Sequence, residues 1–391
     1  MIKKIIILIL VVCLSLVILS PGPVQARDGL TILSDSARVD FPVGLSFSLS
    51  ARSDADITDV RLHYEVDRIG YAQITSEVYI EFVPDTTVDV SWTLEMVRIG
   101  GLPPGSGVDY WWTVEDAMGD QLRTAPVRVG LDDERYPWDS LTEGKITMYW
   151  YEGGQSFAQE VMTTARQALT RLTEDTGAYL EKPVKIYIYA NSRDLQGAMI
   201  YPQEWTGGVA FTRFGIIAIG IELGNLDWGK RAIAHELAHL VVHQMTLNPY
   251  GDLPTWLDEG LAMYAEGEPS PEYVIYLNKA IVEGSLISVR SLSSPFSAFA
   301  EDAVISYAQS YSLVEFLISN YGQDKMLKLL NIFRQGSTYD GALEQVYGFD
   351  MDGLDALWRD YVDAPARPVK QAGLQPVLVG VSGDLVGRQG W

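Results

Sequence analysis

Short runs in which apolar and polar residues alternate fill the chain between residues 30 and 130. They are rich in Val, Leu, Tyr and Trp, and turn signals such as GLPPGSG at 101–107 separate them. The runs are LTILSDSARVDF, DVRLHYEVDR, TVDVSWTLEMV, DYWWTVEDA and APVRVGL. Because strands this short and evenly spaced are typical of two antiparallel sheets packed face to face, we expect residues 28–130 to form a β-sandwich of immunoglobulin or fibronectin type III kind.

The pattern changes after the polar stretch LDDERYPWDS at 131–140, which we interpret as a connection. Strand-like runs at 145–152 and 183–191 flank a segment of helical spacing at 156–177, and residues 206–223 have the pattern of paired strands. Helical spacing dominates from 227 to about 364. The sequence therefore predicts an α+β protein in which residues 140–363 form a second domain with a small sheet and a mainly helical C-terminal half.

The two ends of the chain differ from both regions. Residues 1–26 combine Lys3 and Lys4, an apolar run of 15 residues at 5–19 and a small-residue end at Ala26. This layout predicts a signal peptide cleaved after Ala26; an uncleaved membrane anchor is the alternative, although a bilayer span usually needs about 20 apolar residues. The C-terminal tail, residues 365–391, is rich in Gly, Pro and Val, and we assign no function to it.

Composition indicates which partners the protein can bind and in which cellular compartment it acts. The formal net charge is -22 and the pI is near 4.5, so we expect no nucleic-acid partner, because phosphate binding needs clustered Lys and Arg. The single cysteine, Cys13, lies within the apolar run. We therefore expect a bacterial extracytoplasmic protein without disulfides, associated with a membrane only if the N-terminal segment stays uncleaved.

The segment RAIAHELAHLVVHQM at 231–245 carries the clearest candidate chemistry. His235 and His239 lie four residues apart in a predicted helix, so both imidazoles can reach one zinc ion, and Glu236 lies beside the open position of the metal. Zinc accepts neutral imidazole nitrogen, acidifies its bound water and polarises a carbonyl, while the glutamate takes the proton of the water. These residues predict a site for metal-assisted amide hydrolysis.

We expect His243 to support the site or the fold rather than to be the third ligand, although it completes a run of three histidines. In a continuous helix His243 lies about 12 Å along the axis from His235, too far for both to hold one zinc ion. The segment LPTWLDEGLAMYAEGE at 253–268 offers Asp258 and Glu259 instead. These two point about 100° apart on a helix, so at most one faces the metal, and spacing alone does not choose between them.

The motifs resemble those of the gluzincins of the peptidase MA superfamily, which includes thermolysin and the aminopeptidase N-type enzymes. The resemblance covers roughly residues 140–363 and rests on HELAH at 235–239, WLDEGLAMYAEG at 256–267 and YAQSYSLVEFLISNYG at 307–322. It implies that Glu259, 20 residues after His239, is the third zinc ligand and that Glu236 is general base and general acid. It also implies that Tyr307 stabilises the oxyanion, with Tyr311 as its competitor.

TGGVAF at 206–211 resembles the edge strand along which this family aligns an extended peptide. In aminopeptidases a glutamate that binds the free amine of the substrate follows this strand. Here Thr212, Arg213 and Phe214 follow it, which leaves the cleavage preference open.

Two functions are compatible with these features. The first is an exported zinc metallopeptidase that acts on a peptide or protein substrate. The second is a cell-surface binding or scaffold protein with a structural or degenerate zinc site, in which the sandwich is responsible for recognition. An intact Glu236 favours the enzyme, because a structural zinc site needs no carboxylate at that position.

Overall fold

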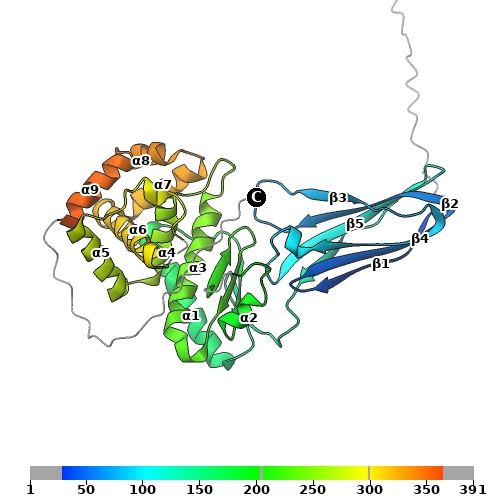
Figure 1. Ribbon diagram of the computed structural model, residues 1–391, viewed down its shortest axis with the longest axis horizontal. Coiled ribbons are helices and arrows are strands. Elements are labelled where there is room, and N and C mark those ends of the chain that lie inside the picture. The colour runs from blue at the N-terminus through cyan, green and yellow to red at the C-terminus, as the bar shows by residue number, and fades with distance from the viewer. Residues whose placement is uncertain (1–28, 203–205, 298–299, 364–391) are drawn as a thin grey trace, which may run out of the picture.

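The computed structural model describes residues 29–202, 206–297 and 300–363 (Figure 1). The predicted signal segment, residues 1–26, and the tail, residues 365–391, lie outside these ranges. Among the helices in the described part of the chain, none is long and apolar enough to cross a membrane. The predicted α+β class is confirmed, with a β-rich N-terminal region followed by a largely helical half.

Seven strands form the N-terminal region and are joined by hydrogen bonds into one sheet. They are β1 (Thr31–Asp40), β2 (Gly44–Val66), β3 (Thr75–Tyr79), β4 (Asp85–Glu95), β5 (Ser106–Asp116), β6 (Gln121–Arg123) and β7 (Val127–Leu131). The long β2 belongs to two layers: residues 44–52 pair with β1 and β4, and residues 57–66 pair with β3 and β5. The layers meet face to face, since the ring of Phe47 in one lies 4.9 Å from that of Tyr110 in the other.

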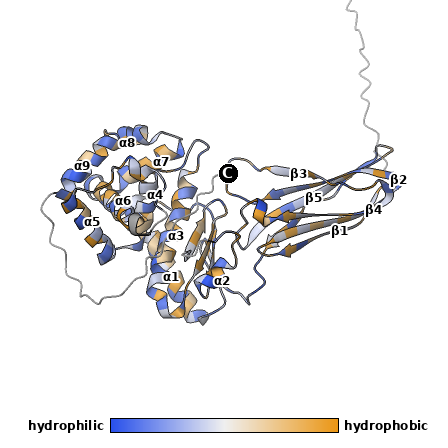
Figure 2. Ribbon diagram, in the orientation of Figure 1, coloured by the Kyte–Doolittle hydropathy of each residue, from blue (hydrophilic) through white to orange (hydrophobic). Residues whose placement is uncertain are grey.

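A second sheet follows, with strand order β11-β12-β10-β9-β8. Its strands are β8 (Asp139–Glu143), β9 (Ile146–Trp150), β10 (Val184–Tyr189), β11 (Gly208–Phe211) and β12 (Ile216–Gly220). β10 is parallel to β9 and β12, whereas β11 runs antiparallel to β12 and forms one edge. Figure 2 shows that these strands are mainly hydrophobic, whereas α1 (Gly154–Thr176) carries both kinds of residue, as expected for a helix that covers a buried sheet.

Six longer helices and the short α2 (Ser192–Gln196) accompany α1. The six are α3 (Leu226–Thr246), α4 (Thr255–Glu266), α5 (Pro271–Glu283), α6 (Ala300–Tyr321), α7 (Gln323–Arg334) and α9 (Met351–Asp363). The nine-residue α8 (Tyr339–Tyr347) and three 3₁₀ turns, η1 (Met96–Arg98), η2 (Leu223–Asn225) and η3 (Ser291–Ser293), complete the set in the described residues. α3 packs against α1, α4 and the edge strand β11, so it is buried on most of its circumference.

Loops of the N-terminal region contact the second region directly. The Lys185 ammonium of β10 donates a hydrogen bond of 2.7 Å to the Gly105 carbonyl, and the Ile69 N–H donates one of 2.6 Å to the Arg213 carbonyl. These bonds place the loop after β2 beside the turn after β11. The Tyr71 hydroxyl of the same loop donates to the Asn248 carbonyl, so the interface between the two regions reaches the end of α3.

Close approach of α4 to α6 requires a glycine at position 260. A Cβ atom there would collide with the Ser310 carbonyl oxygen and would lie 2.6 Å from the Val314 Cγ2. Backbone at this distance cannot move aside as the end of a flexible side chain can. Gly260 therefore sets how closely α4, with its acidic residues, lies against α6.

We expect Gly260→Ala to lower the free energy of unfolding by about 1–3 kcal/mol, because overpacking outweighs the gain of about 1 kcal/mol in helix propensity. Urea unfolding of the chelator-treated protein measures the change. Gly224→Ala is the matched control, since a Cβ at the exposed Gly224 meets no atom within 4 Å. Equal stability of the two variants would contradict the packing argument.

Candidate metal centre

Two histidines on α3 direct one ring nitrogen each toward a common point. His235 and His239 are separated by one helical turn, and both are 3% exposed. Their Nε2 atoms lie 3.2 Å apart. Two imidazole nitrogens at this distance, buried and facing each other, are arranged as ligands of one ion rather than as surface residues.

The other nitrogen of each ring is held by a carboxylate from α4. His235 Nδ1 lies 2.9 Å from Glu266 Oε1, and His239 Nδ1 lies 3.0 Å from Asp258 Oδ1. A histidine that donates its Nδ1–H to a carboxylate keeps the lone pair of Nε2 free for a metal and cannot rotate. Arg231 holds the second oxygen of Glu266, with its Nε 3.2 Å from Oε2.

Glu259 supplies the third atom of the cluster. Its Oε2 lies 3.5 Å from both His235 Nε2 and His239 Nε2, and this buried oxygen makes no hydrogen bond within the described residues. Zinc at about 2.0–2.1 Å from tetrahedral ligands places those ligands roughly 3.3–3.5 Å apart. The three donor atoms therefore fit a zinc ion.

Asp258 and Glu259 turn to different sides of α4, as expected for neighbours on a helix. Glu259 faces the two Nε2 atoms, whereas Asp258 lies behind His239 and also contacts His243, with its Oδ2 2.9 Å from His243 Nε2. The choice that spacing left open is thus made by how α4 crosses α3. His243 is not brought to the His235–His239–Glu259 cluster.

Glu236 is fully buried beside this cluster. A Cβ at Gly208 of β11 would lie 3.5 Å from the Glu236 Cγ, so the side chain faces the edge strand. Neither carboxylate oxygen makes a hydrogen bond of normal geometry within the part of the chain that the structure describes. Burial raises the pKa of this carboxyl above its usual range and Glu259 raises it further, against the lowering effect of the two histidines and of the nearby Ala210 N–H.

His239 titrates unusually in the metal-free protein. Burial lowers the pKa of its ring, but the carboxylates of Asp258 and Glu259 outweigh burial and raise the pKa to about 10. The ring is therefore cationic at neutral pH, which compensates part of the negative charge that Asp258 and Glu259 bring into the core.

The two candidate tyrosines lie on α6, one turn apart. Tyr307 is 7% exposed and packs in a cluster with Met263 of α4 and with Phe296, whose ring lies 5.2 Å away edge to face. Tyr311 stacks on Tyr264 at 6.0 Å. Burial raises the pKa of the Tyr311 hydroxyl, and Glu315 and Glu268 raise it further, so its surroundings are acidic rather than electropositive.

Sequence reasoning missed Glu266 as the partner of His235. The signal was present, because Glu266 lies seven residues after Glu259 and two turns of helix bring i and i+7 to the same face. The bond between Asp258 and His243 was also missed, since it depends on the crossing of two helices.

Comparisons with known proteins identify the superfamily of the chain. The chain matches the peptidase MA superfamily over residues 164–364, just over half of its length. Similar solved structures include the M1 zinc metallopeptidase of Deinococcus radiodurans, which is 14% identical and aligns over 87% of this chain and 96% of its own with a TM-score of 0.38. Aminopeptidase A of Legionella pneumophila in complex with aspartic acid is 12% identical, over 84% of this chain and 50% of its own, with a TM-score of 0.37.

No curated protein matches the chain. Both structural likenesses are distant, so the assignment rests on the family match over residues 164–364. The resemblance inferred from the HELAH and WLDEG motifs is confirmed at this level, and the chain belongs to the peptidase MA superfamily.

Proposed function

We propose that this protein is an exported zinc metallopeptidase that hydrolyses peptide bonds, with His235, His239 and Glu259 as the zinc ligands and Glu236 as the general base. The observation that carries the proposal is the set of three donor atoms 3.2–3.5 Å apart, beside a buried carboxylate that makes no side-chain hydrogen bond within the described residues. Zinc bound there supplies a Lewis acid that polarises the scissile carbonyl and acidifies water.

Glu236 is the general base and then the general acid in this mechanism. Its pKa is raised by burial, which makes the carboxylate a stronger base than an exposed glutamate. A carboxylate oxygen of Glu236 takes a proton from the attacking water and then gives it to the leaving nitrogen of the substrate. A structural zinc site has no use for a desolvated carboxylate at this place, so the alternative of a scaffold protein is disfavoured.

The edge strand β11 is the proposed binding site for the backbone of an extended substrate. It has a neighbour, β12, on one side only within the described sheet, so its other edge can pair with the backbone of an extended peptide. Thr212, Arg213 and Phe214 follow this strand, and none of them is an acid that could hold a free amine. We therefore do not restrict the proposal to aminopeptidase activity.

Export is proposed from the first 26 residues alone, which have the layout of a signal peptide. The mature protein would then act outside the cytoplasm, in a bacterial envelope or medium. N-terminal sequencing of the protein recovered from the medium or envelope tests this, and an intact Met1 would contradict cleavage.

We expect Glu236→Gln to bind zinc as the wild type does and to lose about 10²–10⁴-fold in kcat, the usual contribution of general acid–base catalysis. Zinc content by metal analysis and cleavage of a peptide library measure the two effects. Glu222→Gln, at an exposed position just before α3, is the control and should leave both unchanged. Undiminished hydrolysis by the Glu236 variant would exclude this mechanism.

Tyr307 is proposed to donate its hydroxyl to the developing oxyanion, which is worth a few kcal/mol in acyl transfer. We expect Tyr307→Phe to lower kcat about 10²-fold with little change in KM, because the bond forms only in the transition state. Steady-state kinetics on the same peptides measure both constants. The matched variant Tyr311→Phe should retain activity, and the reverse result would assign the role to Tyr311.

We expect zinc binding at pH 7 to release a proton from His239. The ring of the metal-free protein is protonated because its pKa is raised to about 10, and zinc requires the neutral ring, so affinity should rise with pH up to that value. Calorimetry in buffers of different ionisation enthalpy measures the release. Asp258→Asn removes the charge that raises the His239 pKa most, so zinc binding to this variant should release fewer protons. A binding enthalpy of the wild type that does not depend on the buffer would contradict the expectation.

A further inference from the structure

His243 belongs to none of the roles assigned so far, yet it is tied to the metal centre. Its Nε2 lies 2.9 Å from Asp258 Oδ2, while Oδ1 of the same carboxylate lies 3.0 Å from His239 Nδ1. Asp258 is only 4% exposed. One buried carboxylate thus holds two imidazoles of the same helix, one of which is a proposed ligand.

Orientation of His239 depends on this carboxylate. A group that holds the outer nitrogen of a zinc-binding histidine fixes its ring, and removal of such a group typically weakens metal binding 10–100-fold. Asp258 can do so only if its own carboxyl plane is fixed. The bond from His243 to the second oxygen supplies that restraint, because two contacts on opposite oxygens prevent rotation about the terminal bond.

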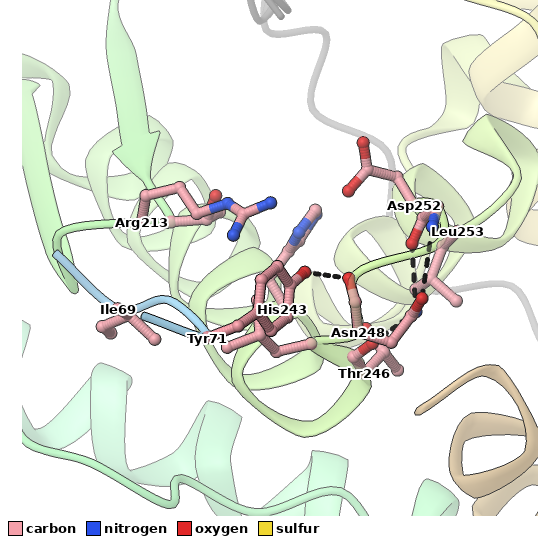
Figure 3. Close-up of a pocket in the computed structure, with 11 residues that line it drawn as sticks. Ile69, Tyr71, Arg213, His243, Thr246, Asn248, Asp252 and Leu253 are labelled. Atoms are coloured by element: carbon pink, nitrogen blue, oxygen red, sulfur yellow. Dashed lines mark hydrogen bonds between the residues drawn. The ribbon is translucent and has the colours of Figure 1, made fainter. Parts of the chain in front are cut away.

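The other side of His243 faces the N-terminal region. A small cavity of about 20 Å³, enough for about one water molecule, lies between the end of α3, the turn after β11 and the loop after β2. Figure 3 shows His243 among Ile69, Tyr71 and Arg213 at this place. The Tyr71 hydroxyl donates to the Asn248 carbonyl just beyond α3, so the loop is anchored to the helix that carries His243.

We propose that His243 is a positioning residue of the metal centre, which fixes Asp258 and through it the ring of His239, and that the loop of residues 67–74 of the N-terminal sandwich packs over it. This inference rests on the proposed function, since it concerns the residues that would hold zinc. The loop and His243 line the same cavity, and His243 in turn bonds to Asp258, which holds the ring of His239.

A second metal ion is the competing explanation for this cluster. Ligand atoms of His239, His243 and Asp258 all lie within 4.8 Å of one another. The contacts of 2.9 and 3.0 Å are hydrogen-bond distances, however, and a second ion would have to take the Nδ1 of a histidine whose Nε2 already faces the first site. Hydrogen bonding accounts for the geometry without an extra charge.

The test compares two amides at position 243. The amide of Gln can reach the place of the histidine Nε2 and donate to Asp258, whereas that of Asn is one methylene shorter and cannot. We expect His243→Asn to bind zinc about tenfold more weakly, with faster zinc loss to a chelator, and His243→Gln to stay within about threefold of the wild type. His63→Asn, a histidine of the N-terminal sandwich that bonds to Thr113, is the control and should leave zinc affinity unchanged.

Three results would overturn the proposal: zinc affinity of the Asn variant equal to that of the wild type, equal losses in the Asn and Gln variants, or a second equivalent of zinc in the wild type that either variant loses. Failure of the proposed function is a separate outcome. It would appear in the wild type, as no zinc bound or no peptide cleaved, before any variant is compared.

Discussion

Burial of charge around one point of α3 is the constraint on which the rest of the helical half depends. Glu236, Asp258 and Glu259 are at most 7% exposed, and they share the core with two imidazoles. Isolated carboxylates in such surroundings cost several kcal/mol each unless they are paired. The protein compensates part of this cost with hydrogen bonds from histidines and with a protonated His239, and a bound dication would compensate much of the rest. α3 and α4 must therefore keep a fixed crossing, because a shift of either separates the charges from their partners.

That crossing is set by small residues and by the register of α4. Gly260 brings the α4 backbone against the Ser310 carbonyl of α6, and this contact fixes the side of α4 that faces α3. Once α4 is in place, Glu259 and Glu266 point toward the histidines from one face, and Asp258 points behind them. The glycine next to Glu259 is thus a packing requirement of the contact between α4 and α6.

The parts predicted well from the sequence are those that local periodicity determines. Alternating runs located β1, β4, β5, β7 and the second half of β2, and the rise of an α-helix was sufficient to separate His243 from the pair His235 and His239. The first half of β2, β3 and β6 lie outside the predicted runs, and β8 begins within the stretch at 131–140 that was predicted to be a connection. The choice between Asp258 and Glu259 could not come from spacing, because it depends on the angle at which two helices meet. The division of β2 between two layers could not be predicted either, because it also depends on tertiary structure. Strands far along the chain pair with its two halves and determine where β2 passes from one layer to the other. Glu266 could have been found from its i+7 relation to Glu259, whereas the bond between His243 and Asp258 depends on tertiary packing and could not.

Glu236 is the residue least consistent with a purely structural explanation of this cluster. Asp258 and Glu266 satisfy their oxygens with histidine and arginine nitrogens, and Glu259 lies between two imidazoles. Glu236 has the same burial and no such side-chain partner within the described residues, although an apolar residue such as Leu would avoid the cost. Local violations of good packing concentrate at functional sites, and a buried carboxylate without a side-chain hydrogen bond is such a violation. Stability therefore supports the same proposal as the chemistry, in which the two histidines and Glu259 would hold an ion and Glu236 would exchange a proton next to it.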